Sequence, residues 1–180
     1  VQRLQEDFAG AGERMTAIEH IRQADTILVT FLMHLGDLVL TTPFLHVLRK
    51  AAPQAKITYL VDEKLLDVVR FNKNIDEVLT IDKKGKDNSI GALWKQAQKL
   101  RERHFDVLIS LHPNERCSFL GAASGARYKA GAVHRMLQPF FDAPSRLDRT
   151  KHAADMYIEV LEKLGVEDRA HQGLEMWTSP

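Results

Sequence analysis

The stretch "TILVTFLMHLGDLVLTTPFLHVLRKAAPQAKITYLV", residues 26–61, decides the fold. It opens with a nearly continuous apolar run at 26–31, which is typical of a strand covered on both faces. A helical pattern follows over about 37–52, and a second strand pattern closes the stretch at 55–61. The apolar stripe of that helix is Leu38, Thr41, Leu45, Leu48 and Ala52. Strand, helix and strand in this order predict a right-handed crossover that joins two parallel strands.

Strand and helix patterns continue to alternate along the rest of the chain. The further strands that we predict are 77–81, 105–111 and 127–132, and the further helices are 62–71, 90–103, 115–123 and 151–164. The fold class predicted from this order is α/β, a doubly wound parallel sheet. Ligands bind at the carboxyl ends of the strands in such sheets, so the loops that follow the strands are the places to search for a site.

Pro43 interrupts the pattern of the first predicted helix. One alternative is a helix that begins at Asp37 and bends at Pro43, which lacks the N–H group that would reach the Val39 carbonyl. The other is a helix that begins at Thr42 with Pro43 in its first turn. We favour the bent helix, because the apolar periodicity starts early.

Composition places the chain among soluble globular proteins of one domain. The chain has 180 residues, with 25 Lys and Arg against 24 Asp and Glu, and this balance argues against a dedicated nucleic-acid binder. Cys117 is the single cysteine, so no disulfide can form within the chain, and this fits a reducing cytosol. No apolar stretch approaches the roughly 20 residues that span a bilayer.

Asp37 is the residue that we single out for chemistry. Aspartate is among the best residues for the N-terminal cap of a helix, and capping could be its whole role. The other interpretation is functional, because Asp37 lies between the end of the first strand and the helix that follows it, at the edge of the sheet where ligands bind. Gly36 before it would let the backbone turn tightly, and His34 lies in the same turn.

Several well-known motifs are absent. The first turn lacks GxGxxG, which disfavours a dinucleotide site of the usual kind, and no GxxxxGK[ST] occurs. The eight histidines include no pair at metal-binding spacing beside a carboxylate. We therefore expect no metal and no cofactor.

Polar side chains cluster in three further loops. "DKKGKDN" at 82–88 carries three lysines that either form a solvated turn or hold phosphate groups. "LHPNER" at 111–116 carries His112 and Asn114, which could equally be a turn that opens a helix. Arg135 lies in a long loop after the fifth strand, and long ordered loops are often functional.

Three segments together resemble a known family. "ILVTFLMHLGDLVLTTPFLHVLRKAAPQAKITYLV", "FDVLISLHPN" and "GARYKAGA" are similar to the ADP-heptose-dependent lipopolysaccharide heptosyltransferases of glycosyltransferase family 9, most of all to the heptosyltransferase III type. The likeness covers about residues 26–178 and only the amino-terminal half of that family. It implies a Rossmann-like N-terminal domain of a GT-B glycosyltransferase.

The resemblance also implies roles, a donor and a location. It implies inverting transfer of heptose to the lipopolysaccharide inner core, with Asp37 as catalytic base and ADP-heptose as donor substrate. It further implies a cytoplasmic protein at the inner face of the bacterial inner membrane, with peripheral membrane contact. The candidate acceptor-binding residues are His34, Gly36, Lys83, Lys84, Lys86, His112, Asn114 and Arg135.

The resemblance also sets the expected domain boundaries. Residues 1–24 are an extension or a lead-in helix, 25–175 the acceptor-binding domain, and 176–180 the start of a linker to a carboxyl-terminal donor domain. "LEMWTSP" at the end is expected to be a strand. The 180-residue chain alone is expected to be inactive as a transferase.

Two rival functions remain at this point. The first is a non-catalytic module with a Rossmann-like fold that binds anionic glycans or nucleotides, in which Asp37 only caps a helix. The second is a receiver-like signalling domain, which is weakened because no other acid adjoins Asp37 to hold magnesium.

Overall fold

The computed structural model describes residues 15–177 of the chain. Within these residues, six strands form one sheet in the order β3-β2-β1-β4-β5-β6, and every neighbouring pair is parallel. The strands are β1 (Thr26–Thr30), β2 (Lys56–Asp62), β3 (Glu77–Ile81), β4 (Val107–Ser110), β5 (Tyr128–Ala132) and β6 (Ala143–Ser145). The doubly wound parallel sheet expected from the sequence is confirmed.

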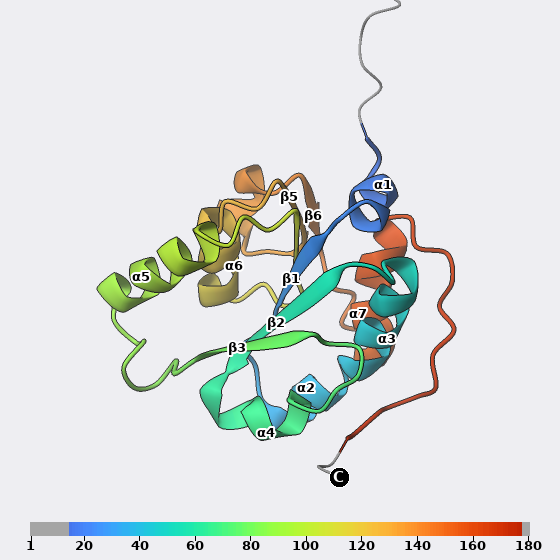
Figure 1. Cartoon of the computed structure of the whole chain (residues 1–180), viewed down its shortest axis with the longest axis horizontal. Helices are drawn as coiled ribbons and strands as arrows, with labels where there is room; N and C mark the ends of the chain where they lie inside the picture. Colours follow the sequence, from blue (N-terminus) through green and yellow to red (C-terminus); the bar gives the residue numbers. More distant parts are fainter. Residues whose placement is uncertain (1–14, 178–180) are drawn as a thin grey trace, which may run out of the picture.

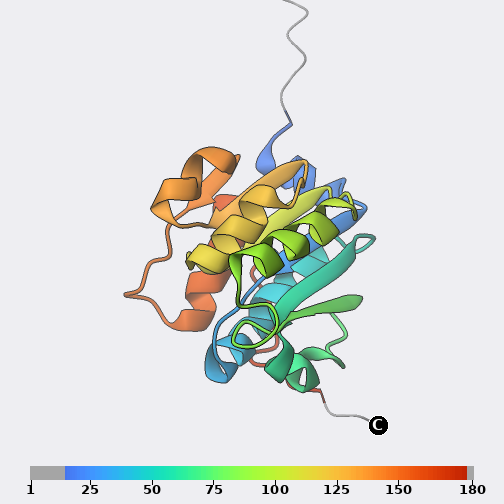
Figure 2. The ribbon, with the colours of Figure 1, turned by 90° about the vertical axis from the view of Figure 1, so that its left-hand side faces the viewer.

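Helices cover both faces of this sheet (Figure 1). The helical elements are α1 (Ala17–Arg22), α2 (Leu35–Val39), α3 (Thr42–Ala51), η2 (Glu63–Leu65), α4 (Leu66–Val69), α5 (Ile90–Arg101), α6 (Glu115–Ala123), η3 (Arg135–Phe140) and α7 (Ala153–Lys163). Helices α3 and α7 pack together on one face, and α5 and α6 pack together on the other. Figure 2 shows the second pair from the front.

The central strands are apolar along their whole length because each face of the sheet has its own core. In β1, Ile27 and Val29 are buried in the core under α3 and α7, whereas Leu28 is buried in the core under α5 and α6. Side chains of successive strand residues point to opposite faces, so a strand covered on both faces needs an unbroken apolar run.

The prediction of a single bent helix over 37–52 is wrong. The structure has a short helix, α2, and a separate helix, α3, which begins at Thr42 with Pro43 in its first turn. The Thr42 hydroxyl donates to the Val39 carbonyl at 2.8 Å, the oxygen that Pro43 has no N–H to reach. The Thr41 hydroxyl donates to the Leu38 carbonyl at 2.7 Å. The two threonines thus end α2 without leaving its last carbonyls unpaired.

The sequence analysis missed the sixth strand. β6 has three residues and lies at the edge of the sheet, paired with β5. Pro144 lies in its middle, and proline is tolerated in a strand mainly at a sheet edge, because it has no N–H to donate and at an edge that position can face the solvent. A strand this short, with proline, offers no alternating pattern to detect.

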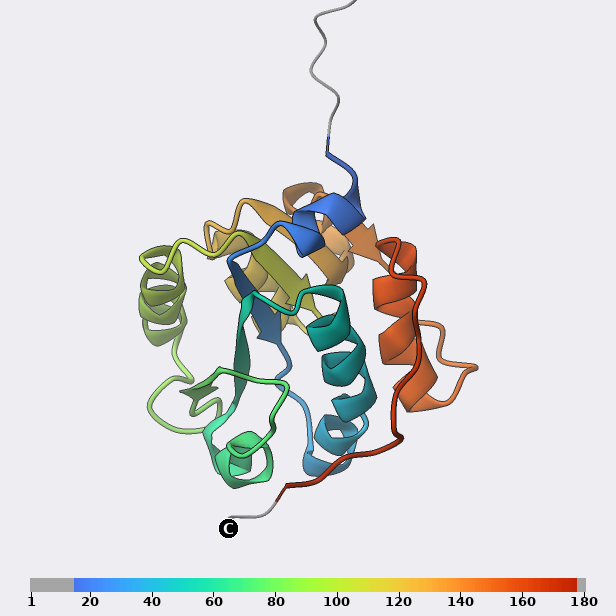
Figure 3. The same cartoon turned by 45° about the vertical axis from the view of Figure 1, so that its right-hand side comes forward.

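The structure describes the two ends of the chain only in part. Helix α1 lies within the lead-in segment 1–24, but residues 1–14 lie outside the described part of the chain. The expected strand at the other end is absent from residues 174–177, and residues 178–180 lie outside the described part. The C-terminal segment runs beside α7 and α3 instead (Figure 3). Glu175 fixes it there, because its N–H donates to the Thr42 hydroxyl at 3.0 Å.

The structure contains no helix, among residues 15–177, that is both long enough and apolar enough to span a bilayer.

The close approach of β5 to β4 at Gly131 can be tested by substitution. Its φ is +102°, and a Cβ atom there would lie 2.2 Å from the Ser110 carbonyl oxygen. Gly131→Ala should therefore lower the free energy of unfolding by about 3 kcal/mol or more, measured by urea denaturation. Gly36→Ala is the matched control, because a Cβ atom at Gly36 meets nothing within 4 Å. It should leave stability unchanged or raise it by up to about 1 kcal/mol. Equal stability of the two variants would contradict the close approach.

Candidate functional site

The loops that follow β1 and β4 meet at the carboxyl edge of the sheet. These strands are neighbours at the centre of the sheet, and Thr30 pairs with Ser110 at their ends. The chain leaves β1 toward α3 on one face and leaves β4 toward α6 on the other. This reversal opens a crevice in which doubly wound proteins bind their ligands.

A cavity of about 440 Å³ occupies this crevice, on the side of α7. Its walls combine apolar side chains, a carboxylate, an imidazole, a phenol and two cations. The lining residues are Met33, Asp37, His112, Leu147, Arg149, Lys151, Ala153, Met156 and Tyr157. The structure thus brings two of the predicted site residues, Asp37 and His112, into one cavity.

Asp37 does not cap α2. The N-terminal cap of that helix is His34, and Asp37 is its third residue. Asp37 is half-buried, and no hydrogen bond or ion pair reaches its carboxylate from any residue of the described range 15–177. The capping role that the sequence left open is therefore wrong, and the carboxylate is free to meet a ligand in the cavity.

His112 is held as a neutral imidazole. The Asn114 N–H donates to His112 Nδ1 at 3.2 Å, so Nδ1 carries a lone pair and the ring proton lies on Nε2. Burial lowers the pKa of His112, the positive charge of Arg149 lowers it further, and the negative charge of Asp37 opposes both. His112 can therefore donate a hydrogen bond from Nε2 at neutral pH.

Tyr157 also lines the cavity. Its ring packs edge-on against Phe31 at 5.4 Å, and the His112 ring does the same at 6.4 Å. Burial raises the pKa of Tyr157 to about 12, and the nearby charge of Asp37 adds to the shift. The phenol therefore stays protonated and can donate a hydrogen bond into the cavity.

Arg149 and Lys151 are the cavity residues that the sequence analysis missed. Both are exposed at the rim and lie in the connection between β6 and α7. Lys151 pairs with Glu159 at 3.1 Å, whereas Arg149 has no ion pair with any residue that the structure describes. The sequence feature that could have indicated these two residues is the long connection before the last helix, which has two basic residues at its end.

Lys83 does not line the cavity that holds Asp37. Its ammonium donates to the Leu32 and Met33 carbonyls at 3.0 and 3.1 Å and lies 3.1 Å from the Asp62 carboxylate. These contacts tie the loop after β3 to the loop after β1. Lys83 thus has a structural role here, and its contact with an acceptor phosphate stays a prediction.

The other two lysines of that loop are exposed, and neither lines the cavity that holds Asp37. Lys86 pairs with Glu63 at 3.1 Å. Lys84 makes no contact of its side chain with another charged group in the described residues. The three lysines, close together in the sequence, thus have three different surroundings.

The remaining candidates lie outside the cavity. The Asn114 side chain caps α6 by accepting the Cys117 N–H at 2.7 Å, which is the helix-opening role that the sequence left open. Gly36 lies inside α2 and has no positive φ, so the tight turn attributed to it is wrong. His34 and Arg135 are exposed and do not line the cavity.

No cluster of three His, Cys, Asp or Glu residues that could hold a metal ion occurs in the part of the chain that the structure describes.

Comparison with known proteins supports one family. No family model matches the chain. The chain is 26% identical to lipopolysaccharide heptosyltransferase 3 of Escherichia coli K12 over 140 residues. This match covers 74% of the chain and 40% of that protein. A crystal structure of a glycosyl transferase of family 9 from Veillonella parvula is 47% identical, with a TM-score of 0.83 over 93% of this chain and 47% of that one.

More distant structures share the fold. The Escherichia coli heptosyltransferase WaaC with ADP is 15% identical, with a TM-score of 0.68 over 83% of this chain and 50% of that one. Escherichia coli ADP-heptose heptosyltransferase II is 18% identical, with a TM-score of 0.67 over 84% of this chain and 45% of that one. The resemblance to family 9 is confirmed, and the chain spans about half the length of these relatives or less.

The pKa of His112 should report the charges around the cavity. Arg149→Gln should raise it, because a positive charge that disfavours the imidazolium is removed. Asp37→Asn should lower it further, because a negative charge that favours the imidazolium is removed. NMR titration of the histidine ring measures both shifts. Arg127→Gln, at the opposite edge of the sheet, is the control and should leave it unchanged. Shifts of the same sign in the two cavity variants would contradict the arrangement.

Lys83 and Lys84 should differ in their effect on stability. Lys83→Met keeps the apolar stem but leaves the buried Asp62 carboxylate without its partner, so unfolding free energy should fall by about 3 kcal/mol. Lys84→Met, at an exposed neighbour, should change it by less than about 0.5 kcal/mol. Urea denaturation of both variants measures the difference. Wild-type stability in Lys83→Met would show that the contacts of Lys83 are dispensable.

Proposed function

We propose that the chain is the acceptor-binding, base-carrying half of a glycosyltransferase that moves heptose from ADP-heptose to the lipopolysaccharide inner core with inversion. The observation that carries the proposal is the unpartnered carboxylate of Asp37 in a cavity whose rim carries Arg149 and Lys151. The resemblance to family 9 supplies the donor, the acceptor and the location at the inner face of the bacterial inner membrane.

Inverting sugar transfer needs one base in the protein. The acceptor hydroxyl oxygen forms a bond to the anomeric carbon, and its proton passes to Asp37. The bond between the anomeric carbon and the diphosphate oxygen breaks on the opposite face of the sugar, and ADP leaves with the electron pair. A diphosphate leaves as a stable anion, so no second acid has to protonate it.

His112 is the other group in the cavity that could in principle accept a proton. Its Nδ1 already accepts the Asn114 N–H, and its Nε2 carries the ring proton. Neither nitrogen has a lone pair that faces the cavity. His112 therefore acts as a donor that orients the acceptor, and Asp37 is the base.

The charges at the rim favour an anionic acceptor. Arg149 lies close enough to His112 to lower the pKa of that imidazole. The positive charge of the Arg149 guanidinium is therefore felt inside the cavity. A guanidinium binds phosphate or carboxylate through two parallel hydrogen bonds. The inner core carries such groups, and Arg149 with Lys151 would hold them while the hydroxyl faces Asp37.

A binding module without catalysis is the second candidate. An isolated carboxylate such as Asp37 would weaken the binding of an anionic ligand, because the two negative charges repel each other. A site that only bound an anionic ligand would gain no electrostatic attraction from that carboxylate. Its position in the cavity therefore favours proton transfer over simple binding.

Replacement of Asp37 separates these functions. The enzyme for the test is a chimera that joins this chain to the part of the Veillonella parvula protein that it does not match. In that chimera, Asp37→Asn should reduce heptose transfer by about 10² to 10⁴-fold, the usual contribution of a general base. Turnover is measured as ADP release with a phosphorylated core oligosaccharide as acceptor.

Binding of the acceptor to the 180-residue chain provides the control. Calorimetric titration should show that Asp37→Asn binds the anionic oligosaccharide at least as tightly as the wild type, whereas Arg149→Gln binds it about tenfold more weakly. Wild-type turnover in the Asp37→Asn chimera would sink the assignment of the base. Robust turnover by the 180-residue chain alone would show that no second half is needed.

A further inference from the structure

The two edges of the sheet are protected to different degrees. The sheet ends at β6 on one side and at β3 on the other. β6 has three residues with Pro144 in its middle, and both its shortness and its proline hinder pairing with a further strand. β3 has five residues, Glu77–Ile81, and contains neither proline nor glycine. The edge at β3 therefore lacks the two safeguards that the edge at β6 has.

The outer side of β3 offers backbone groups for pairing. The strand pairs with β2, and no strand in the part of the chain that the structure describes lies on its other side. Just before β3, the Asp76 N–H donates to the Ile57 carbonyl at 2.9 Å, and successive residues of a parallel ladder face opposite neighbours. Glu77, Leu79 and Ile81 therefore direct their N–H and C=O groups away from β2. None of these groups has a hydrogen-bond partner among the described residues.

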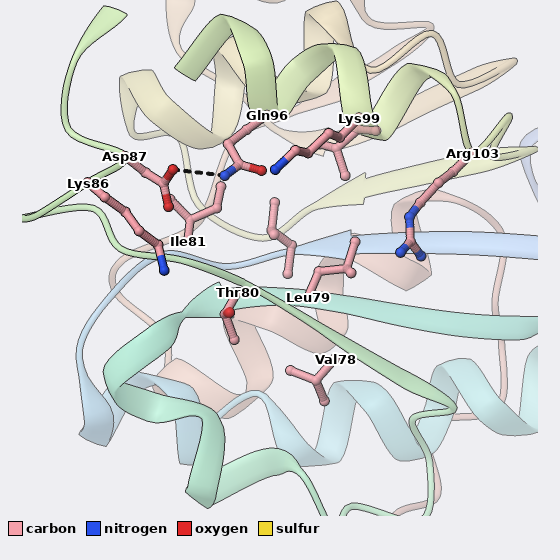
Figure 4. A pocket seen from close by; sticks show the side chains of 11 residues that line it. Val78, Leu79, Thr80, Ile81, Lys86, Asp87, Gln96, Lys99 and Arg103 are labelled. Carbon is pink, nitrogen blue, oxygen red and sulfur yellow. Dashed lines mark hydrogen bonds between the residues drawn. The ribbon is translucent and has the colours of Figure 1, made fainter. Parts of the chain in front are cut away.

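A groove of about 350 Å³ runs along this edge, between β3 and α5 (Figure 4). Four consecutive residues of β3, 78–81, line it. Successive strand residues point to opposite faces of a sheet, so a groove that meets all four lies at the edge of the strand and not on one face. The first four residues of β3 are only half-buried, whereas every residue of the central strand β4 is buried. The edge is thus open to an extended peptide.

The groove is cationic. Gln96, Lys99 and Arg103 line it from α5 and the turn that ends this helix, and their spacing of three and four residues places them on one side. Figure 4 shows the side chains of Gln96 and Lys99 below α5, on the side of β3. Lys86 adds a further cation, and Asp87 is the acid that lines the groove. Asp87 accepts a hydrogen bond from the Gln96 amide at 2.8 Å, so its carboxylate already has a partner.

Two of these cations can hold carboxylates at the spacing of a strand. Lys99 is exposed and has no ion pair with any described residue. Arg103 pairs with Glu77 through Nη1, and its other guanidinium N–H groups remain available. Four residues at the helical rise separate Lys99 from Arg103 by about 6 Å. Side chains on the same face of an extended peptide are about 6.6 Å apart, so an acid at every second position matches both cations.

We propose that an acidic, extended segment of a partner protein adds to the sheet as a further strand beside β3. Its backbone pairs with the outward groups of Glu77, Leu79 and Ile81, and its acidic side chains, at every second position, meet Lys99 and Arg103. In this mode of recognition the main chain supplies affinity and the alternate side chains supply specificity. Strand addition needs neither a sugar donor nor an acceptor, so the proposal does not rest on the proposed transferase function.

Titration with model peptides tests the strand addition. The probe is a short dye-labelled peptide, blocked at both ends, that alternates valine with glutamate. Fluorescence anisotropy should show that the 180-residue chain binds it at least about tenfold more tightly than the same peptide with lysine in place of glutamate, because the groove is cationic. Added salt should weaken the binding. Equal binding of the two peptides, or binding of neither, would overturn the proposal.

Backbone pairing has a signature that charge attraction alone does not produce. Methylation of alternate backbone nitrogens of the peptide should abolish binding for one set of positions and spare it for the other, because only one set of N–H groups faces β3. In the bound protein, hydrogen exchange of the Leu79 N–H should slow by about tenfold or more, whereas that of the Val78 N–H, which already faces β2, should not change. Equal effects of the two methylation patterns would refute strand addition.

Charge reversal on α5 locates the site. Lys99→Glu should weaken binding of the acidic peptide by at least about tenfold and strengthen binding of the lysine peptide, because the sign of the charge at the groove is reversed. Lys95→Glu is the matched control, since Lys95 is an exposed residue of the same helix that does not line the groove. It changes the net charge equally and should leave both affinities unchanged. Equal losses in the two variants would contradict binding in the groove.

Self-association is the competing use of this edge. A second copy of the chain could satisfy the outward backbone groups by pairing its own β3 with the first. The two cationic grooves would then lie close together and repel each other, so analytical ultracentrifugation should show a monomer at the concentrations of the titration. A dimer that the acidic peptide does not displace would overturn the proposal and assign the edge to a second copy.

Discussion

The parallel pairing of β1 with β2 and β4 is the constraint on which the rest of the structure depends. β1 lies between these two strands, and apolar side chains cover it on both faces. Burial of this kind allows one register, because a slip by one residue would exchange the side chains of the two cores. The register brings the ends of β1 and β4 together. It therefore fixes where the loops of Asp37 and His112 meet, although these residues are 75 positions apart in the sequence.

The break between α2 and α3 follows from Pro43. A continuous helix through Pro43 would leave the Val39 carbonyl unpaired, and the hydroxyls of Thr41 and Thr42 remove that cost by ending α2 early. Helix α2 begins after His34, and Asp37 is its third residue. Its carboxylate stays unpartnered at the cavity. The "TTP" sequence therefore decides where α2 ends, two residues after Asp37.

Basic residues in this chain separate into structural and surface groups according to what surrounds them. Lys83 binds two carbonyls and the buried Asp62, and it holds two loops of the carboxyl edge together. Arg149 and Lys151 line the rim of the cavity, where an anionic ligand would meet them. The cations of α5 face the solvent beside exposed apolar side chains. A nearly neutral total charge therefore conceals a cationic rim and a cationic surface, each next to a different feature of the fold.

The sequence by itself determined the parallel sheet, the strand that precedes Asp37 and the family resemblance, because these depend on apolar periodicity and on residues that are close in the chain. Asp37 and His112 could be found in the same way, since each directly follows a buried strand. Only the tertiary structure decided the partners of the side chains. It turned Lys83 inward, made Asn114 a cap and brought Arg149 to the cavity from a connection more than a hundred residues away. Such contacts depend on the distance between loops in space, and periodicity within one segment carries no record of that distance.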